Sequence, residues 1–341
     1  ADTFLESLIL DDHRVVGVTV SQNGVKESFR AVREVIVSAG ALHSPAILMR
    51  AGIGPADHLK EMGISVVSDL PGVGENLQEH PAVAIATYLK PSARMLPHMR
   101  RHTYLALRCS SRTEGCPSGD VKISPSNLVA GHPLGRALGT IAVIITKPFS
   151  KGSVRLNSTA SNDEPLVAFN LLSDERDLHR LAWGLHLANQ ILDSTPINNC
   201  SSDRFLASYD DDVRALSAPT LKNWISTRLA GRLLDAGPLI RRFLVKHALS
   251  RGTKLQIIMK DNAALQAWIK KNVYGGWHAT GTCRMGANDD HLAVLDSACK
   301  VRGIEGLRVA DASVMPSVVS ANTNITTIMI GEKVSDLILR E

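Results

Sequence analysis

Hydrophobic and polar positions alternate along the first part of the chain, a pattern that predicts short β-strands. We expect strands over residues 4–10 and 15–20, separated by a turn at 11–13. Asn23-Gly24 then indicates a tight hairpin, because both residues tolerate the left-handed backbone of such a turn. The apolar run 35–37 predicts a buried strand.

Helical spacing of apolar residues appears later. A helix is predicted from Ser44, because Pro45 suits a first helical position. Residues 174–193 place leucines and alanines on one helical face, with Asp174 as the N-cap. Residues 203–271 are expected to be mostly helical, and a final helix is expected over 326–339.

A turn-rich segment over residues 70–81 marks a change of domain. Beyond it the pattern is again strand-like, including residues 140–147 and 152–157.

Composition is that of a globular protein, with 44% hydrophobic residues and a net charge of +5. Basic residues gather at 90–112 and 228–254, which we interpret as solvated faces. With only 4% aromatic residues there is little to stack on bases, so no nucleic acid partner is expected. The longest apolar run, 138–146, is too short for a membrane span.

The chain has five scattered cysteines and no Cys-x-x-Cys pair. Neither a zinc site nor a disulfide framework is therefore predicted, and a cytoplasmic location with reduced thiols is expected. No signal peptide is apparent. Because position 1 is not Met and a strand follows at once, we expect the N-terminus to be a cut.

Gly-rich phosphate loops are the first chemical motif to test. A dinucleotide fingerprint needs Gly-x-Gly-x-x-Gly, and Gly52-x-Gly54 and Gly72-x-Gly74 have Asp57 and Leu77 at the third position. Neither pair qualifies, and no Walker loop or nucleophile elbow is present.

His278 lies among Gly and Thr residues, where it could serve as a general base or have a structural role. Cys283 raises the alternative of a Cys/His nucleophile, but no orienting partner is evident. Asn322 precedes the last helix and could face a ligand or simply be its N-cap. Asp311 and Ser313 follow a short strand over 307–310, where open α/β sheets bind ligands.

Five segments in order resemble the glucose–methanol–choline (GMC) family of FAD-dependent oxidoreductases. They are Ser38–Pro45 with Gly52–Pro55, Val73–His80, Pro148–Leu156, His278–Gly286 and Asp311–Gly331. Glu79 stands in the second segment where the family usually has Asp.

The resemblance implies a fold of the α+β or α/β class, with an incomplete FAD-binding domain and a substrate domain that has an antiparallel sheet flanked by helices. The parts would be residues 1–80 (FAD-binding), 81–270 (substrate-binding) and 271–341 (return to the FAD-binding domain). The family's N-terminal Gly-rich loop has no counterpart in this chain. We therefore expect the 341-residue chain by itself to bind FAD poorly, which a titration would test.

The resemblance also assigns site residues. It implies that His278 is the catalytic base and Asn322 its partner. It places FAD beside six residues: Ser38, Ala39, Asp311, Ala312, Thr323 and Asn324. The implied reaction is oxidation of an alcohol by hydride transfer to the flavin.

Substrate choice is weakly constrained. A quaternary ammonium substrate favours an aromatic cage, so few aromatic residues favour a neutral alcohol. Two alternatives stay open: a catalytically inactive fragment unable to hold FAD, and a GMC-related lyase without net redox chemistry.

Overall fold

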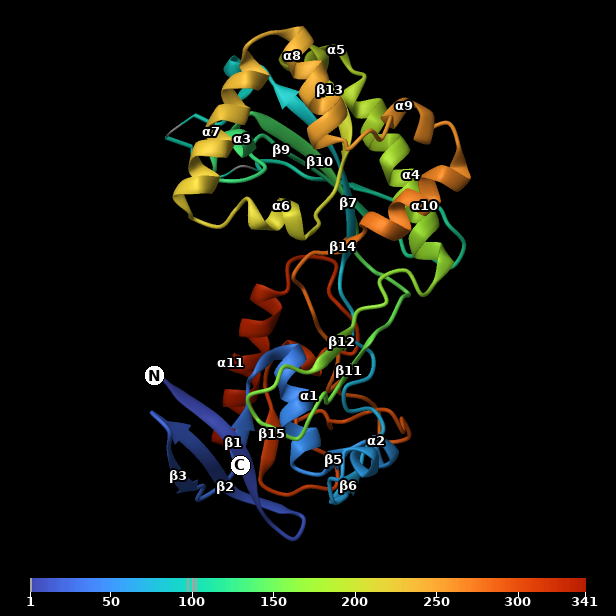
Figure 1. The fold of residues 1–341 in the computed structure, drawn as a ribbon. Coiled ribbons are helices and arrows are strands. Elements are labelled where there is room, and N and C mark those ends of the chain that lie inside the picture. The colour runs from blue at the N-terminus through green and yellow to red at the C-terminus, as the bar shows by residue number, and fades with distance from the viewer. Residues whose placement is uncertain (1, 97, 100, 102) are drawn as a thin grey trace. The chain divides into compact units, whose positions relative to one another are not determined.

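The computed structural model describes residues 2–96, 98–99, 101 and 103–341. The chain forms two compact units (Figure 1). Unit 1 comprises residues 1–80, 150–173 and 277–341, and unit 2 comprises residues 81–149 and 174–276. The sequence placed a boundary after residue 80 as well, but grouped 150–173 with the substrate domain and 271–276 with the final segment.

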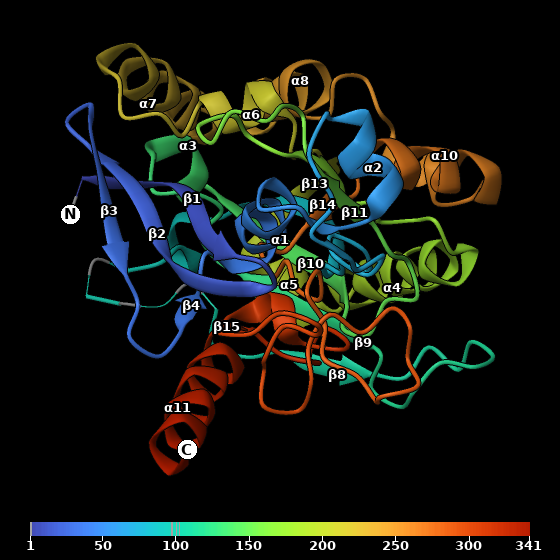
Figure 2. The same cartoon turned by 90° about the horizontal axis from the view of Figure 1, so that it is seen from below.

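Unit 1 begins with an antiparallel sheet of β1 (Thr3–Asp11), β2 (Arg14–Gln22) and β3 (Val25–Arg30), whose strands lie side by side in Figure 2. The predicted strands and hairpin are confirmed. Asn23 and Gly24 have φ angles of 52° and 81°, the left-handed conformation that the tight turn requires.

A parallel strand pair supports the candidate site in unit 1. β4 (Val35–Val37) pairs with β15 (Leu307–Val309), so both carboxyl ends lie at the same edge. Helix α1 (Gly40–Arg50) follows β4, which corrects the predicted start at Ser44. Pro45 lies inside the helix, because hydrogen bonds to Asp311 and Ser44 already hold the chain at residues 39 and 40.

Other elements of unit 1 are short, apart from the last helix. They are β5 (Ile53–Gly54), α2 (Ala56–Glu61), β6 (Ser68–Asp69), β11 (Ser153–Arg155), β12 (Leu166–Ala168), η3 (Ala312–Val314) and α11 (Asn324–Arg340). Their apolar side chains form one core, in which Leu48, Ile53, Leu77 and Val309 are fully buried.

Unit 2 contains an antiparallel sheet in the order β13-β7-β10-β9-β8, with β14 also paired to β7. The strands are β7 (Pro81–Leu89), β8 (Leu107–Cys109), β9 (Val121–Ser126), β10 (Leu138–Ile145), β13 (Ser201–Ala207) and β14 (Tyr274–Gly275). Residues 203–207 were expected to be helical, but they form β13 because pairing with β7 satisfies their backbone.

Helix α4 (Glu175–Leu192) packs against β7, β9 and β10. Asp174 is its N-cap, as predicted, and accepts a 3.0 Å hydrogen bond from Arg176 N. A Cβ on Gly184 would lie 2.3 Å from Val143 Cγ1, so this close approach requires glycine. The sheet with its helices confirms the predicted fold class.

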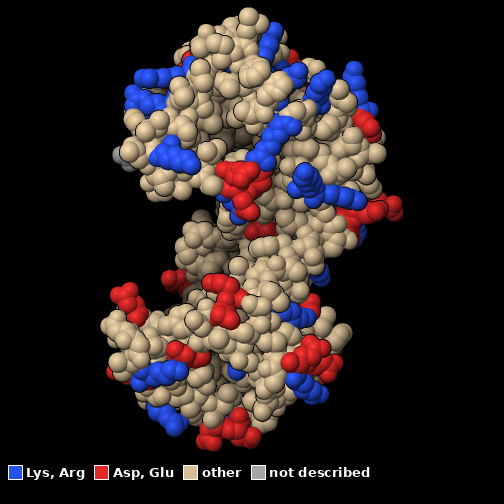
Figure 3. All heavy atoms as spheres, in the orientation of Figure 1, with Lys and Arg blue, Asp and Glu red and all other residues tan. Residues whose placement is uncertain are grey.

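The remaining short elements of unit 2 are mainly helical. They are η1 (Pro91–Ala93), α3 (Pro133–Arg136), α5 (Thr195–Cys200), α6 (Asp211–Ala215), α7 (Leu221–Asp235), α8 (Pro238–Leu244), the π-helical turn η2 (Val245–Leu249), α9 (Leu255–Ile258) and α10 (Asn262–Asn272). None of the helices formed by the described residues combines the length and apolar character that a membrane crossing needs. Lys, Arg, Asp and Glu side chains are interspersed on the face shown in Figure 3.

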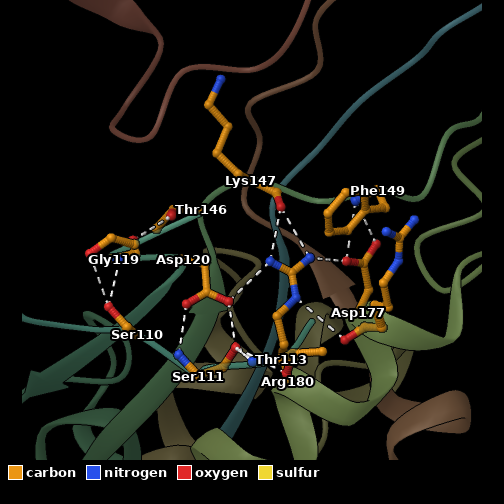
Figure 4. A network of polar contacts seen from close by, with 12 residues as sticks. Ser110, Ser111, Thr113, Gly119, Asp120, Thr146, Lys147, Phe149, Asp177 and Arg180 are labelled. Carbon is orange, nitrogen blue, oxygen red and sulfur yellow. Dashed lines mark hydrogen bonds and ion pairs between the residues drawn. The ribbon is translucent and has the colours of Figure 1, made fainter. Parts of the chain in front are cut away.

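A buried ionic network joins the sheet of unit 2 to α4 (Figure 4). Arg180, which is fully buried, pairs with Asp177 and with Asp120 Oδ2 at 3.3 Å. Both of its terminal nitrogens also donate to Lys147 O at 3.0 Å. Asp177 in turn accepts from Phe149 N, so each charged group has several partners.

Candidate active site

The candidate site is built around His278, in a segment of unit 1 without regular secondary structure. Its backbone N–H donates to Glu79 Oε2 at 2.7 Å. Two residues on, Thr280 pairs with Gln78 as an isolated antiparallel bridge. The preceding Trp277 has a φ of 60° and is 71% exposed. Contacts with residues 78–80 therefore hold this irregular segment in place.

Both ring nitrogens of His278 have a side-chain neighbour. Asn322 Nδ2 lies 3.1 Å from Nε2, and His80 Nδ1 lies 3.0 Å from Nδ1. The structure thus brings together the two residues that the sequence assigned to one site, 44 positions apart. Asn322 is exposed, so this end of the array is open to small molecules.

The N-cap interpretation of Asn322 is wrong. Helix α11 begins at Asn324, and Thr323 occupies the N-cap position without a side-chain capping bond. Asn322 therefore lies one residue too early to cap the helix. Its amide is directed to His278 instead.

Four of the six cofactor candidates lie at the carboxyl ends of the parallel strands. Ser38 and Ala39 follow β4, while Asp311 and Ala312 follow β15, and Ser38 Oγ donates to Ala310 O at 3.0 Å. The Asp311 carboxylate accepts from Gly40 N, Ser44 Oγ and Ser313 N at 2.8, 2.5 and 2.7 Å. Asp311 thereby joins the two strand ends to the start of α1.

The His278 segment runs alongside this edge. Gly281 N donates to Ala312 O at 3.2 Å, and Cys283 N donates to Ser313 O at 2.9 Å. Gly281 has a φ of 90°, and a Cβ there would lie 2.6 Å from Asn76 O. Glycine therefore allows the segment to pass close to its neighbours. The base candidate and Asp311–Ala312 belong to one connected array.

Thr323 and Asn324, the other two candidates, open α11. The absence of a side-chain cap at Thr323 leaves backbone N–H groups of this 17-residue helix for another acceptor. A helix start of this kind favours carbonyl oxygens and anions. These features fit a nucleotide cofactor. They are the carboxyl ends of the parallel strands, the uncapped start of α11, and Ser38 and Ala39, which are exposed.

Cys283 is not a nucleophile in this fold. Its side chain is fully buried, and burial raises the pKa of the thiol, with the Asp311 charge adding to the rise. A thiol held in its protonated form is a poor nucleophile. The sequence alternative of a Cys/His pair is therefore wrong.

Two residues of the site, Glu79 and His80, were not predicted. They lie in the turn-rich segment that resembles a family motif, and a Glu-His pair there was the only local signal. Nothing in one sequence relates His80 to a residue 198 positions away.

Comparisons with known proteins agree on one family. Two family models described as GMC oxidoreductase match residues 148–331 and 2–82. The 5-(hydroxymethyl)furfural oxidase of Methylovorus sp. (strain MP688) is 36% identical over 338 residues, which cover 98% of this chain and 56% of that protein. Choline oxidase of Arthrobacter globiformis is 31% identical, with 97% of this chain and 54% of that protein covered. The chain thus spans a little over half the length of these relatives.

Solved structures share the fold at low identity. Pyridoxine 4-oxidase from Mesorbium loti has a TM-score of 0.75 at 21% identity, covering 99% of this chain and 57% of that one. Formate oxidase of Aspergillus oryzae RIB40, studied for FAD modification, also gives 0.75 at 21% identity, covering 98% and 59%. FAD is the cofactor that these comparisons indicate for the family.

Proposed function

Because the chain belongs to the glucose–methanol–choline oxidoreductase family, we propose that the protein containing it oxidises an alcohol to an aldehyde or ketone with FAD. One observation carries the proposal. His278 Nε2 and Asn322 Nδ2 lie 3.1 Å apart at the exposed end of a buried polar array. A hydroxyl oxygen placed beside this pair can lie within hydrogen-bond distance of both nitrogens.

His278 is the proton acceptor in this proposal. Neutral imidazole is the common general base near neutral pH. Taking the hydroxyl proton at Nε2 builds negative charge on the substrate oxygen, which weakens the hold of the carbon on its hydride. Glu79, 4% exposed, holds the His278 backbone and keeps the ring in position.

Asn322 stabilises the charge that this proton transfer creates. Its amide N–H, directed to His278 Nε2 in this structure, would donate to the substrate oxygen once an alcohol occupies the site. A fixed donor of this kind acts most strongly on the developing alkoxide.

FAD would be held by Ser38, Ala39, Asp311, Ala312, Thr323 and Asn324. When bound, the flavin supplies the hydride acceptor. The residues of this chain contribute the strand ends, the uncapped helix start and the proton acceptor. Buried Glu79 and His80 exclude water from the inner side of His278.

A small neutral alcohol is the substrate class that we favour. The chain contains few aromatic residues for a cage around a cation, and its identity to the 5-(hydroxymethyl)furfural oxidase exceeds that to the choline oxidase. We further infer a reducing, cytoplasmic location, which the five unpaired cysteines support.

Anaerobic titration of the complete flavoprotein with an alcohol tests the proposal. A primary aryl alcohol should bleach the oxidised flavin absorbance and yield one aldehyde per flavin. A protein that binds FAD but keeps its absorbance, while cleaving or condensing the substrate, would be a lyase. A protein that does not bind FAD would be the catalytically inactive fragment.

A further inference from the structure

His80 has a ring nitrogen whose protonation state is fixed by its neighbour. It is 3% exposed, and its Nε2 lies 2.9 Å from the carbonyl oxygen of Val319. A carbonyl oxygen only accepts hydrogen bonds, so the proton must be on Nε2. Neutral His80 then has its lone pair on Nδ1.

That lone pair determines the tautomer of His278. The two Nδ1 atoms are 3.0 Å apart, with the rings edge-to-face at 74°. Since His80 Nδ1 accepts, His278 Nδ1 must carry a proton. The lone pair of neutral His278 is therefore on Nε2, facing Asn322. The amide N–H of Asn322 at 3.1 Å agrees with this assignment, because it too needs an acceptor there.

Glu79 fixes both histidines to the same anchor. Its Oε1 accepts from His80 N at 2.6 Å and its Oε2 from His278 N at 2.7 Å. Ligand atoms of the three side chains lie within 4.8 Å of one another, a spacing that could also suit a metal ion. All three side chains already form hydrogen bonds, however, which favours a role in proton transfer over metal binding.

We propose that His80 is a positioning residue that sets the Nε2-unprotonated tautomer of His278, and that Glu79 compensates the positive charge formed when His278 takes a proton. This inference rests on the proposed function for its catalytic consequence. Protonation at Nε2 leaves the bond from His278 Nδ1 to His80 intact, so the array needs no rearrangement. Hydrogen bonds from the Val319 carbonyl through His80 thus hold His278 in the tautomer that can accept a proton at Nε2.

Two variants of His80 test its hydrogen bonds to His278 and to Val319 O one at a time. His80→Asn places an amide oxygen near the former Nδ1 and can still accept from His278. His80→Gln places its amide nitrogen near the former Nε2 and keeps the bond to Val319 O, but loses the acceptor. Both variants have similar polarity, so each is the control for the other.

The readout is the ¹⁵N signal of His278 in the complete flavoprotein with labelled histidine. The chain has 12 histidines, so the signal is assigned by its loss in His278→Gln. We expect a protonated Nδ1 and an unprotonated Nε2 in the parent and in His80→Asn, and a mixture of tautomers in His80→Gln. The rate of flavin reduction by alcohol should fall about 10–100-fold in His80→Gln and less in His80→Asn, the range found when hydrogen-bond partners of metal-bound histidines are removed.

A parent protein with its His278 proton on Nε2 would overturn the proposal before any variant is made. Equal loss of rate in both variants with an unchanged tautomer would also overturn it and leave His80 a packing role. If the tautomers behave as expected but alcohol reduces no flavin even in the parent, the proposed function fails while the assignment of His80 stands.

Discussion

Two buried polar arrays, one in each unit, differ in how they end. Arg180 in unit 2 meets two carboxylates and two backbone carbonyls, and both carboxylates also accept hydrogen bonds from backbone N–H groups. Glu79, His80 and His278 in unit 1 are bonded at one end to Val319 O, but at the other end reach the exposed Asn322.

The difference separates structural from chemical use of buried polar groups. In a closed array each buried charge has partners within the array, so removal of one member leaves the others buried without a partner. An open array keeps a lone pair and a donor at its exposed end. We therefore expect substitutions in the first array to change stability, and substitutions at the open end of the second to change rate.

His278→Ala should give the largest effect. Removal of a general base costs about 10²–10⁴-fold in rate. Stopped-flow reduction of the flavin by alcohol measures it, with His291→Ala, an exposed histidine of the same unit, as control. A variant that binds FAD and keeps more than about a tenth of the parent rate would show that His278 is not the base.

Arg180→Met should lower the stability of the fold rather than the rate of flavin reduction. Loss of the guanidinium leaves Asp120 and Asp177 buried without their cation, and breaking a buried pair typically costs about 3–5 kcal/mol of the free energy of unfolding. Urea unfolding measures the loss, with the exposed Arg232→Met on α7 as control. If both variants unfold at the same urea concentration, the closed array contributes no stability.

Asn322→Ala should reduce the rate less than His278→Ala, because the proton acceptor remains. A lost donor to a developing oxyanion costs about 2.7–4 kcal/mol at most. The same stopped-flow measurement applies, with the exposed Asn162→Ala as control. Flavin reduction at the parent rate would remove Asn322 from the mechanism, and no capping role would remain, since α11 begins at Asn324.

An ion pair near the surface should give the smallest effect. Hydrogen bonds from Arg284 lower the pKa of Asp290 from 3.8 to about 2. Because the folded-state pKa is depressed, the pair stabilises the fold above pH 4 and loses that contribution as the pH falls towards 2.

Asp290→Asn should therefore flatten the acid side of the stability profile and leave flavin reduction at neutral pH unchanged. Unfolding at a series of pH values between 6 and 2 measures it. Parallel profiles for parent and variant would mean that the pair contributes nothing.

Local sequence signals were enough for many individual elements. The hairpin at Asn23-Gly24, the N-cap at Asp174 and the last helix each depend on neighbouring residues, and the structure contains all three. Such features are readable because the physics that determines them acts over a few positions. The resemblance to a family, which sums many weak signals along the chain, singled out His278 and Asn322 as partners.

Tertiary structure decided what those signals could not. Residues 203–207 became a strand through pairing with β7, and α1 began at Gly40 because Asp311, 271 positions away, holds its first N–H. His80 gained its place beside His278 only through folding. A sequence specifies which groups can donate or accept, but distances between remote segments, and hence tautomers and proton paths, are set by the packing of the whole unit.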